Sequence, residues 1–148
     1  DMAMLEISVG KVAGLIEPYL AMQAALAADD LAASHAAVRS MMEVTGHTGA
    51  VPELLHDMLT LEDLQVLRNG PFNLLSKAMI NAARQDASML GQELIVMHCP
   101  MALDGTGADW LQSAEPLRNP YFGTMMLNCG EITDTISAST VDHSGHAN

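Results

Sequence analysis

The sequence predicts a mainly α-helical fold, a bundle of about four helices with a small β-hairpin-like element and a long ordered loop near the C-terminus. Three observations predict this class. Hydrophobic residues make up 49% of the 148 residues but aromatic residues only 3%, so aliphatic side chains and methionine must build the core. Apolar residues recur at helical spacing as far as Arg84. After Gln92 the chain becomes partly β-branched and then rich in Gly, Asp, Asn and Pro.

The first two helices are predicted by an apolar stripe and by capping residues. The stripe of the first helix follows the i, i+3, i+4, i+7 spacing and consists of Val12, Leu15, Ile16, Tyr19, Leu20, Gln23 and Leu26. Pro18 either kinks this helix or marks a restart near its first turn. Asp29 or Asp30 is suited to cap a second helix, which we expect to end at Gly46.

Two further helical segments precede the change in composition. Pro52 is suited to the start of a third helix. Thr60, with Asp63 three positions later, resembles a capping box that opens a fourth helix. We expect Asn69-Gly70-Pro71 to break that helix, although the apolar stripe resumes from Phe72 onward.

The C-terminal third predicts the β element. Residues 93–99 are short, apolar and partly β-branched, which indicates a strand, and we expect an irregular loop of about twenty residues after Pro100. Residues 125–136 form a candidate partner strand interrupted at Gly130. We therefore expect one metal-binding helical domain over residues 1–136 and a disordered tail over residues 137–148.

Charge and hydropathy exclude several classes of protein. Eighteen acidic residues against six basic ones give a net charge of −12, which repels nucleic acid and anionic lipid and attracts cations. No apolar run approaches the roughly 20 residues that a membrane-spanning helix needs. Because the chain begins at Asp1, we expect a mature product or an excised domain. No arrangement of catalytic side chains is evident, so we expect a protein that is not an enzyme.

Each cysteine is accompanied by a methionine. Cys99 and Met101 are separated by Pro100, and in an extended chain such positions point to the same side. Met126 and Cys129 have a spacing that suits a turn closing on one ion. If the two segments pair, two thiolates and two thioethers converge, a donor set that favours Cu(I), or Ag(I) by the same softness. His98 and Met125 are adjacent spare donors.

Two other interpretations of the cysteines remain open. A Cys99–Cys129 disulfide would close a loop of about 30 residues and contribute roughly 3–4 kcal/mol in the chain-entropy model, and Met101 and Met126 would then be ordinary core. Unpaired buried thiols are the third alternative. A thiol redox enzyme is disfavoured, because there is no Cys-x-x-Cys and only His98 offers a nearby cation.

Other residues predict architecture rather than chemistry. We expect Trp110 and Tyr121 to anchor the long loop to the core, and the Asn119 side chain to bond the backbone of that loop. Glu53 and His56 form a single Glu-x-x-His, whose missing second copy favours a solvated helix face over a di-iron site. His35 is interpreted as a satisfied or exposed histidine. His143 and His146 form either a weak auxiliary metal-binding tail or no site.

Four blocks of the C-terminal third recur together in one known family of domains. These blocks are His98-Cys99-Pro100-Met101-Ala102, Gly107-Ala108-Asp109-Trp110-Leu111-Gln112, Asn119-Pro120-Tyr121-Phe122-Gly123 and Met126-x-x-Cys129-Gly130. With them the chain resembles a bacterial domain family of uncharacterised function, domain-of-unknown-function family 3347, which occurs alone and at the C-terminus of periplasmic adaptor subunits of copper/silver-type heavy-metal efflux pumps. The helical part matches more loosely, and the chain departs from the family pattern at Asn69-Gly70-Pro71, where the family usually continues a helix.

The resemblance implies a periplasmic or lipoprotein-like setting and a part in copper homeostasis. Carried over position by position, it implies that Cys99, Met101, Met126 and Cys129 are the metal ligands. The expected function is binding of Cu(I), or Ag(I), for sequestration or for hand-over to an efflux adaptor or a copper-trafficking protein. The alternative is a structural or protein-interaction module that has a Cys99–Cys129 disulfide and no metal.

Overall fold

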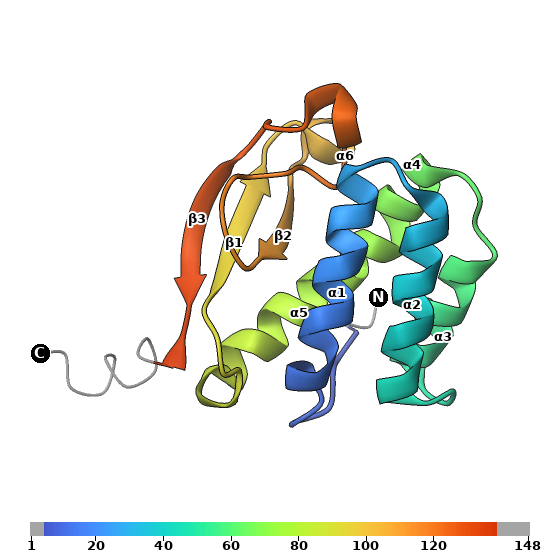
Figure 1. Cartoon of the computed structure of the whole chain (residues 1–148), viewed down its shortest axis with the longest axis vertical. Helices are drawn as coiled ribbons and strands as arrows, with labels where there is room; N and C mark the ends of the chain where they lie inside the picture. Colours follow the sequence, from blue (N-terminus) through green and yellow to red (C-terminus); the bar gives the residue numbers. More distant parts are fainter. Residues whose placement is uncertain (1–4, 139–148) are drawn as a thin grey trace, which may run out of the picture.

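Helices and a small antiparallel sheet lie side by side in the computed structural model, which describes residues 5–138 (Figure 1). Four helices of ten or more residues lie within that range: α1 (Val12–Ala27), α2 (Leu31–Thr45), α3 (Ala50–Leu59) and α5 (Asn73–Gln85). The sheet consists of β1 (Leu94–Cys99), β2 (Ala108–Gln112) and β3 (Glu131–Ile136). Short turns complete the fold, namely α4 (Leu64–Leu67), η1 (Arg68–Phe72), η2 (Ala87–Met89), α6 (Ala102–Gly105) and η3 (Gly123–Met126).

The predicted capping residues lie at helix boundaries, but Thr60 is at the end of a helix and not at the start of one. Asp30 caps α2, because its carboxylate accepts a hydrogen bond from the Ala33 N–H at 2.9 Å. Asp63 caps α4 through the N–H groups of the two residues that follow Leu64. Thr60 does not open a helix as predicted. It ends α3, where its hydroxyl donates to the Asp57 carbonyl at 2.7 Å.

The predicted break at Asn69-Gly70-Pro71 is wrong. The chain passes from α4 into α5 through the π-helical turn η1, which contains Pro71. A π turn accommodates an extra residue by changing the backbone hydrogen-bond pattern, and proline has no N–H that would need a partner. The helix therefore continues toward Phe72, which is fully buried.

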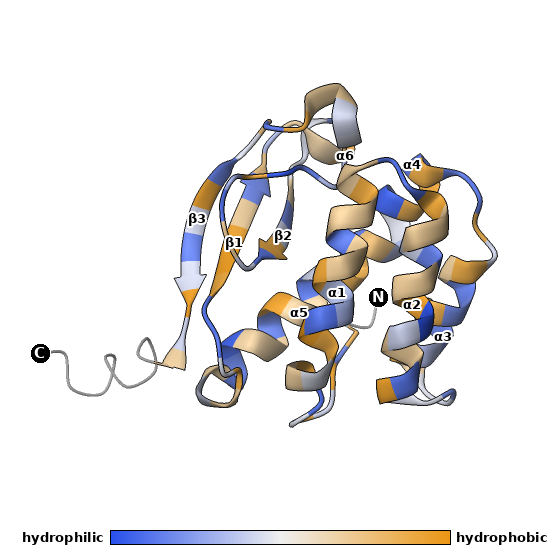
Figure 2. Cartoon of the chain, viewed as in Figure 1, coloured by the Kyte–Doolittle hydropathy of each residue, from blue (hydrophilic) through white to orange (hydrophobic). Residues whose placement is uncertain are grey.

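The β element is a three-stranded sheet in the order β2-β1-β3, with both pairs antiparallel. The predicted partner strand is confirmed only over β3, because its expected first half is the turn η3 and the residues after it. Strand β2 lies within the segment that was expected to be an irregular loop. Its side chains are almost all buried, so it lacks the alternation that reveals a half-buried strand. Strand β3 is an edge strand, and five of its six residues are exposed. Figure 2 shows hydrophilic and hydrophobic residues interspersed along it.

A chain of aromatic rings ties the loop region to the helices. Tyr19 on α1 stacks on Phe72 at 5.6 Å between ring centroids, and Phe72 contacts Tyr121 at 5.5 Å. Tyr121 in turn meets Trp110 of β2 edge-on at 5.9 Å. The expected burial of Trp110 and Tyr121 is confirmed, and six of the methionines that the structure describes fill the core around them: Met22, Met41, Met42, Met58, Met79 and Met97.

An ion pair between the buried Arg68 and the exposed Asp29 joins the end of α1 to the turn η3. The Arg68 guanidinium, 4% exposed, donates to Asp29 Oδ1 at 2.7 Å and to the carbonyls of Leu26 and Pro120. The second carboxylate oxygen of Asp29 accepts hydrogen bonds from the Thr124 N–H and hydroxyl. The Thr124 hydroxyl and then Arg68 hold the pKa of Asp29 below its usual range, so this carboxylate is charged at neutral pH.

Gly123 lies against this ion pair in a left-handed conformation, with φ of +65°. A Cβ at this position would overlap Asp29 Oδ1 and Arg68 Nη2 and lie 3.0 Å from Asp29 Cγ. Gly123→Ala should therefore lower the free energy of unfolding by about 2–4 kcal/mol, measured by urea denaturation.

Gly70→Ala is the matched control, because a Cβ there meets nothing within 4 Å and the residue lies in the helical turn η1. We expect a change of less than about 1 kcal/mol, in the stabilising direction. Equal losses at the two glycines would contradict the assigned role of Gly123.

Candidate metal centre

Cys99 and Cys129 meet at the end of the sheet. Cys99 is the last residue of β1 and is fully buried, whereas Cys129 is half-buried and lies just before β3. Because His98 pairs with Glu131 across β1 and β3, the residue after His98 lies beside the residues that lead into β3. The two Sγ atoms are 3.6 Å apart, and both cysteines are free thiols.

The spacing of the two sulfurs suits ligands of one ion. Two sulfurs bound tetrahedrally at about 2.3 Å from a metal lie about 3.8 Å apart, close to the separation observed. Binding an ion between Cys99 and Cys129 would therefore need little movement of the backbone. A disulfide bond would require the two sulfurs to move closer together, because the sulfurs of a disulfide lie about 2.05 Å apart.

The thiols share a hydrogen bond in the protonated state. This bond to Cys99 is the main reason that the pKa of the Cys129 thiol is raised, and burial adds to the effect. Cysteines that act as nucleophiles or redox groups instead have a lowered pKa. A metal ion would have to displace the thiol protons, which is the ordinary course of thiolate ligation.

Asn119 fixes the backbone that carries Cys129. Its side chain is fully buried, and its amide Nδ2 donates to the Cys129 carbonyl at 2.7 Å. Its Oδ1 accepts from the N–H groups of Tyr121 and Phe122 at 2.8 and 3.2 Å. Its own N–H donates to the Leu127 carbonyl at 2.7 Å. The expected bonding of the Asn119 side chain to the loop backbone is confirmed.

Gly130 allows the same segment to pass closely over β1. A Cβ at Gly130 would lie 2.8 Å from the His98 carbonyl oxygen and 3.4 Å from Trp110 Cη2. Trp110 is fully buried and donates its indole N–H to Gln112 Oε1 at 2.9 Å. The tryptophan is thus the loop anchor that the sequence predicts, and it lies beneath the residue that follows Cys129.

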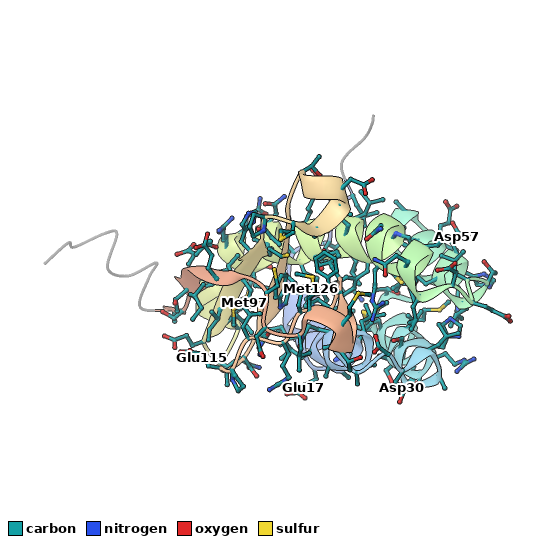
Figure 3. All side chains as sticks on the ribbon, turned by 90° about the horizontal axis from the view of Figure 1, so that it is seen from above. Glu17, Asp30, Asp57, Met97, Glu115 and Met126 are labelled. Atoms are coloured by element: carbon teal, nitrogen blue, oxygen red, sulfur yellow. The ribbon has the colours of Figure 1, made fainter. Side chains whose placement is uncertain are left out.

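The predicted methionine ligands lie on the two turns that flank the cysteines. Met126 is half-buried at the end of η3, and its carbonyl accepts the Cys129 N–H at 3.2 Å, which closes the predicted turn. Figure 3 looks onto this end of the molecule and labels Met126 near its centre. The structure brings the two cysteine sulfurs into direct contact, and Met126 is three residues before Cys129 in the sequence.

The prediction for the backbone at Met101 is wrong. Instead of continuing the extended strand, Met101 adopts a helical conformation (φ −90°, ψ −10°) as the residue that precedes α6. Pro100 follows the last residue of β1 and ends the strand there, so the same-side argument for Cys99 and Met101 does not hold. The Met101 side chain is 57% exposed and lines a surface groove together with Met125.

His98 has a partner that sequence analysis missed. Its Nδ1 lies 2.7 Å from Asp109 Oδ1, and the two residues are directly paired across β1 and β2. His98 is half-buried between two fully or nearly fully buried neighbours, so it faces away from the side of the strand that carries Cys99. Asp109 could not be recognised as a partner because the strand that carries it was interpreted as loop.

The other histidines behave as predicted where the structure describes them. His35 Nε2 is hydrogen-bonded to the Leu61 carbonyl at 2.9 Å, and Glu53 and His56 are exposed on α3. Within residues 5–138, no three His, Cys, Asp or Glu side chains gather as a metal-binding group. His143, His146 and all but the first two residues of the predicted disordered tail lie outside the described residues.

No family model, curated protein or solved structure matches the chain. The resemblance to the efflux-adaptor domain family therefore stays a prediction based on the four sequence blocks. In the part of the chain that the structure describes, none of the helices has both the length and the apolar character that a membrane crossing requires.

The role of Asn119 can be tested directly. Asn119→Ala leaves the Cys129 carbonyl and two loop N–H groups without their buried partner. It should lower the free energy of unfolding by about 2–4 kcal/mol in urea denaturation. Asn128→Ala is the control, because Asn128 is exposed and its side chain donates to the Leu117 carbonyl at 3.0 Å. We expect a loss of about 1 kcal/mol or less there. Similar losses at both positions would show that Asn119 does not hold the loop.

Proposed function

We propose that this protein binds one soft monovalent ion, Cu(I) or its analogue Ag(I), through the thiolates of Cys99 and Cys129. The thioether sulfur of Met126 completes the proposed donor set, whereas Met101, which the sequence assigned to the same site, lines the groove beside it. The observation that carries the proposal is the approach of the two thiols to 3.6 Å in a loop that a buried asparagine holds in place.

The choice of metal follows from the donor atoms. Thiolate and thioether ligands select Cu(I), whereas Zn(II) prefers thiolate, imidazole or carboxylate. The His98 imidazole is engaged with Asp109, so it is not the obvious third ligand that zinc would need. The net charge of −12 raises the local concentration of cations of every kind and does not select among them.

The proposed role is sequestration or transfer rather than catalysis. Cys129 and Met126 are half-buried and Met101 is exposed, so ligands of a partner protein have access to the ion from the loop end of the molecule. Thioethers bind weakly and are replaced one at a time, which suits ligand exchange. The proposed partners are a periplasmic efflux adaptor or a copper-trafficking protein, in keeping with the sequence resemblance.

A disulfide-bonded interaction module is the second candidate. The close approach of the two thiols favours it as well, since oxidation would join the two ends of the loop. Intact-mass measurement under native and reducing conditions separates the candidates, because a disulfide lowers the mass by two hydrogen atoms. An oxidised protein in its native compartment would favour the interaction module.

Anaerobic titration of the reduced protein with Cu(I), against a chromogenic competitor, tests the proposed function. We expect one tightly bound ion per chain and much weaker binding of Zn(II). Met126→Leu should fold, because this core exchange usually costs less than about 1.5 kcal/mol. If the Met126 sulfur is a ligand, the variant should lose at least about tenfold in Cu(I) affinity, about 1.4 kcal/mol.

Met125→Leu is the matched control. Met125 precedes Met126 on η3, but its side chain is 79% exposed, so we expect the equilibrium affinity to be unchanged. Equal losses at the two positions would mean that the assigned ligand is wrong. Zn(II) bound as tightly as Cu(I) would contradict the soft-ion proposal as a whole.

A further inference from the structure

We propose that Met101 and Met125 form a second, outer site for a soft monovalent ion, a thioether pair in a surface groove beside the cysteines. The further step, that an ion enters the thiol site through this pair, rests on the proposed function. The existence of the outer site does not.

The two methionines come from different turns and line the same groove. Met101 precedes α6, Met125 belongs to η3, and the groove between them has a volume of about 290 Å³. Leu103 and Phe122 also line it. The wall is held in place, since Gln65, another lining residue, donates to the Tyr121 carbonyl at 3.0 Å. Two thioethers are thus presented to one space by ordered turns.

The exposure of these two side chains is unusual within this protein. Met101 is 57% exposed and Met125 79%, whereas six other methionines are buried in the core. Exposed apolar side chains add nothing to packing, so core filling does not explain either residue. Thioether sulfur is a ligand for Cu(I) and Ag(I) but a poor one for harder ions, so two methionines that line one groove favour a soft ion as the ligand.

The two groove methionines are also close in sequence to the ligands of the proposed thiol site. Met101 is two residues beyond Cys99, and Met125 is adjacent to Met126. Asp104, which lines the groove, adds a negative charge that attracts cations. The ligands assigned to the inner site are therefore only one or two residues from the groove methionines along each segment.

Transfer of the ion from the outer to the inner site is a ligand exchange and needs no oxidant or reductant. The hydrated ion loses water on binding the two neutral thioethers, and no proton is released at that stage. When the ion moves to Cys99 and Cys129, each thiol that becomes a thiolate ligand gives its proton to solvent. The oxidation state of the metal does not change.

The outer site is tested in a Cys99→Ser/Cys129→Ser variant that carries ¹³C-labelled methionine methyl groups. Silver(I) nitrate is titrated in, and the methyl resonances are followed by NMR. We expect the Met101 and Met125 resonances to shift together along one binding curve. Met89, which is 50% exposed but does not line the groove, is the internal control and should not shift with them.

The outer site would be overturned if the Met101 and Met125 resonances did not shift. It would also be overturned if the Met89 resonance shifted as much as theirs. If the double variant does not fold, Met125→Leu in the cysteine-containing protein provides the second measurement. In that protein the thiol site takes up the first equivalent of Ag(I), so the outer site responds only beyond one equivalent. The Met101 resonance should lose this later response in Met125→Leu, and an unchanged response would overturn the pair.

Loading kinetics test the entry route separately. Stopped-flow transfer of Cu(I) from a weak chelator to the thiol site should be several-fold slower in Met125→Leu, and the affinity of the thiol site, of which Met125 is not a ligand, should stay the same. An unchanged rate would contradict entry through the groove. Methyl shifts without any ion binding at the cysteines would leave the outer site standing while the proposed function fails, so the two failures are distinguishable.

Discussion

The position of the candidate metal centre depends on one buried amide. Asn119 bonds the Cys129 carbonyl, two N–H groups of its own loop and, through its backbone, the Leu127 carbonyl. A buried polar group that lost these partners would be costly, so the loop has little freedom to adopt another path. The approach of Cys129 to Cys99 follows from this constraint together with the pairing of β3 on β1.

Polar ties then connect this loop to the helices. Gln112 Oε1 accepts from the Trp110 indole and the Arg118 N–H, and Gln23 on α1 donates to the Arg118 carbonyl at 2.7 Å. At the other end of the loop, Arg68 joins the Pro120 carbonyl to Asp29. The aromatic contacts supply the apolar part of the same junction. The helices therefore act as the rigid support of a loop that carries the sulfur atoms.

The sequence allowed the helical stripe, the cap at Asp30 as one of two candidates, the burial of Trp110 and the bonding of Asn119 to be predicted, whereas Asp63 replaces Thr60 as the cap of α4. Each of these depends on local chemistry. It did not reveal β2, whose buried side chains do not alternate, or the π turn that carries Pro71 through a helix. Arg68 was missed because nothing local marks a basic residue as buried. The conformation of Met101 was misjudged because Pro100 ends the strand. The cysteine–methionine spacing was recognised, but the grouping of Met101 with Met125 needed the three-dimensional structure.

X-ray absorption at the copper K-edge of the Cu(I)-loaded protein tests the central claim most directly. We expect the first coordination shell of the copper ion to consist only of sulfur, with thiolate distances near 2.3 Å. The sulfur contribution should be weaker after Met126→Leu. Nitrogen or oxygen atoms in the first shell, or a spectrum unchanged by Cys99→Ser, would contradict the claim.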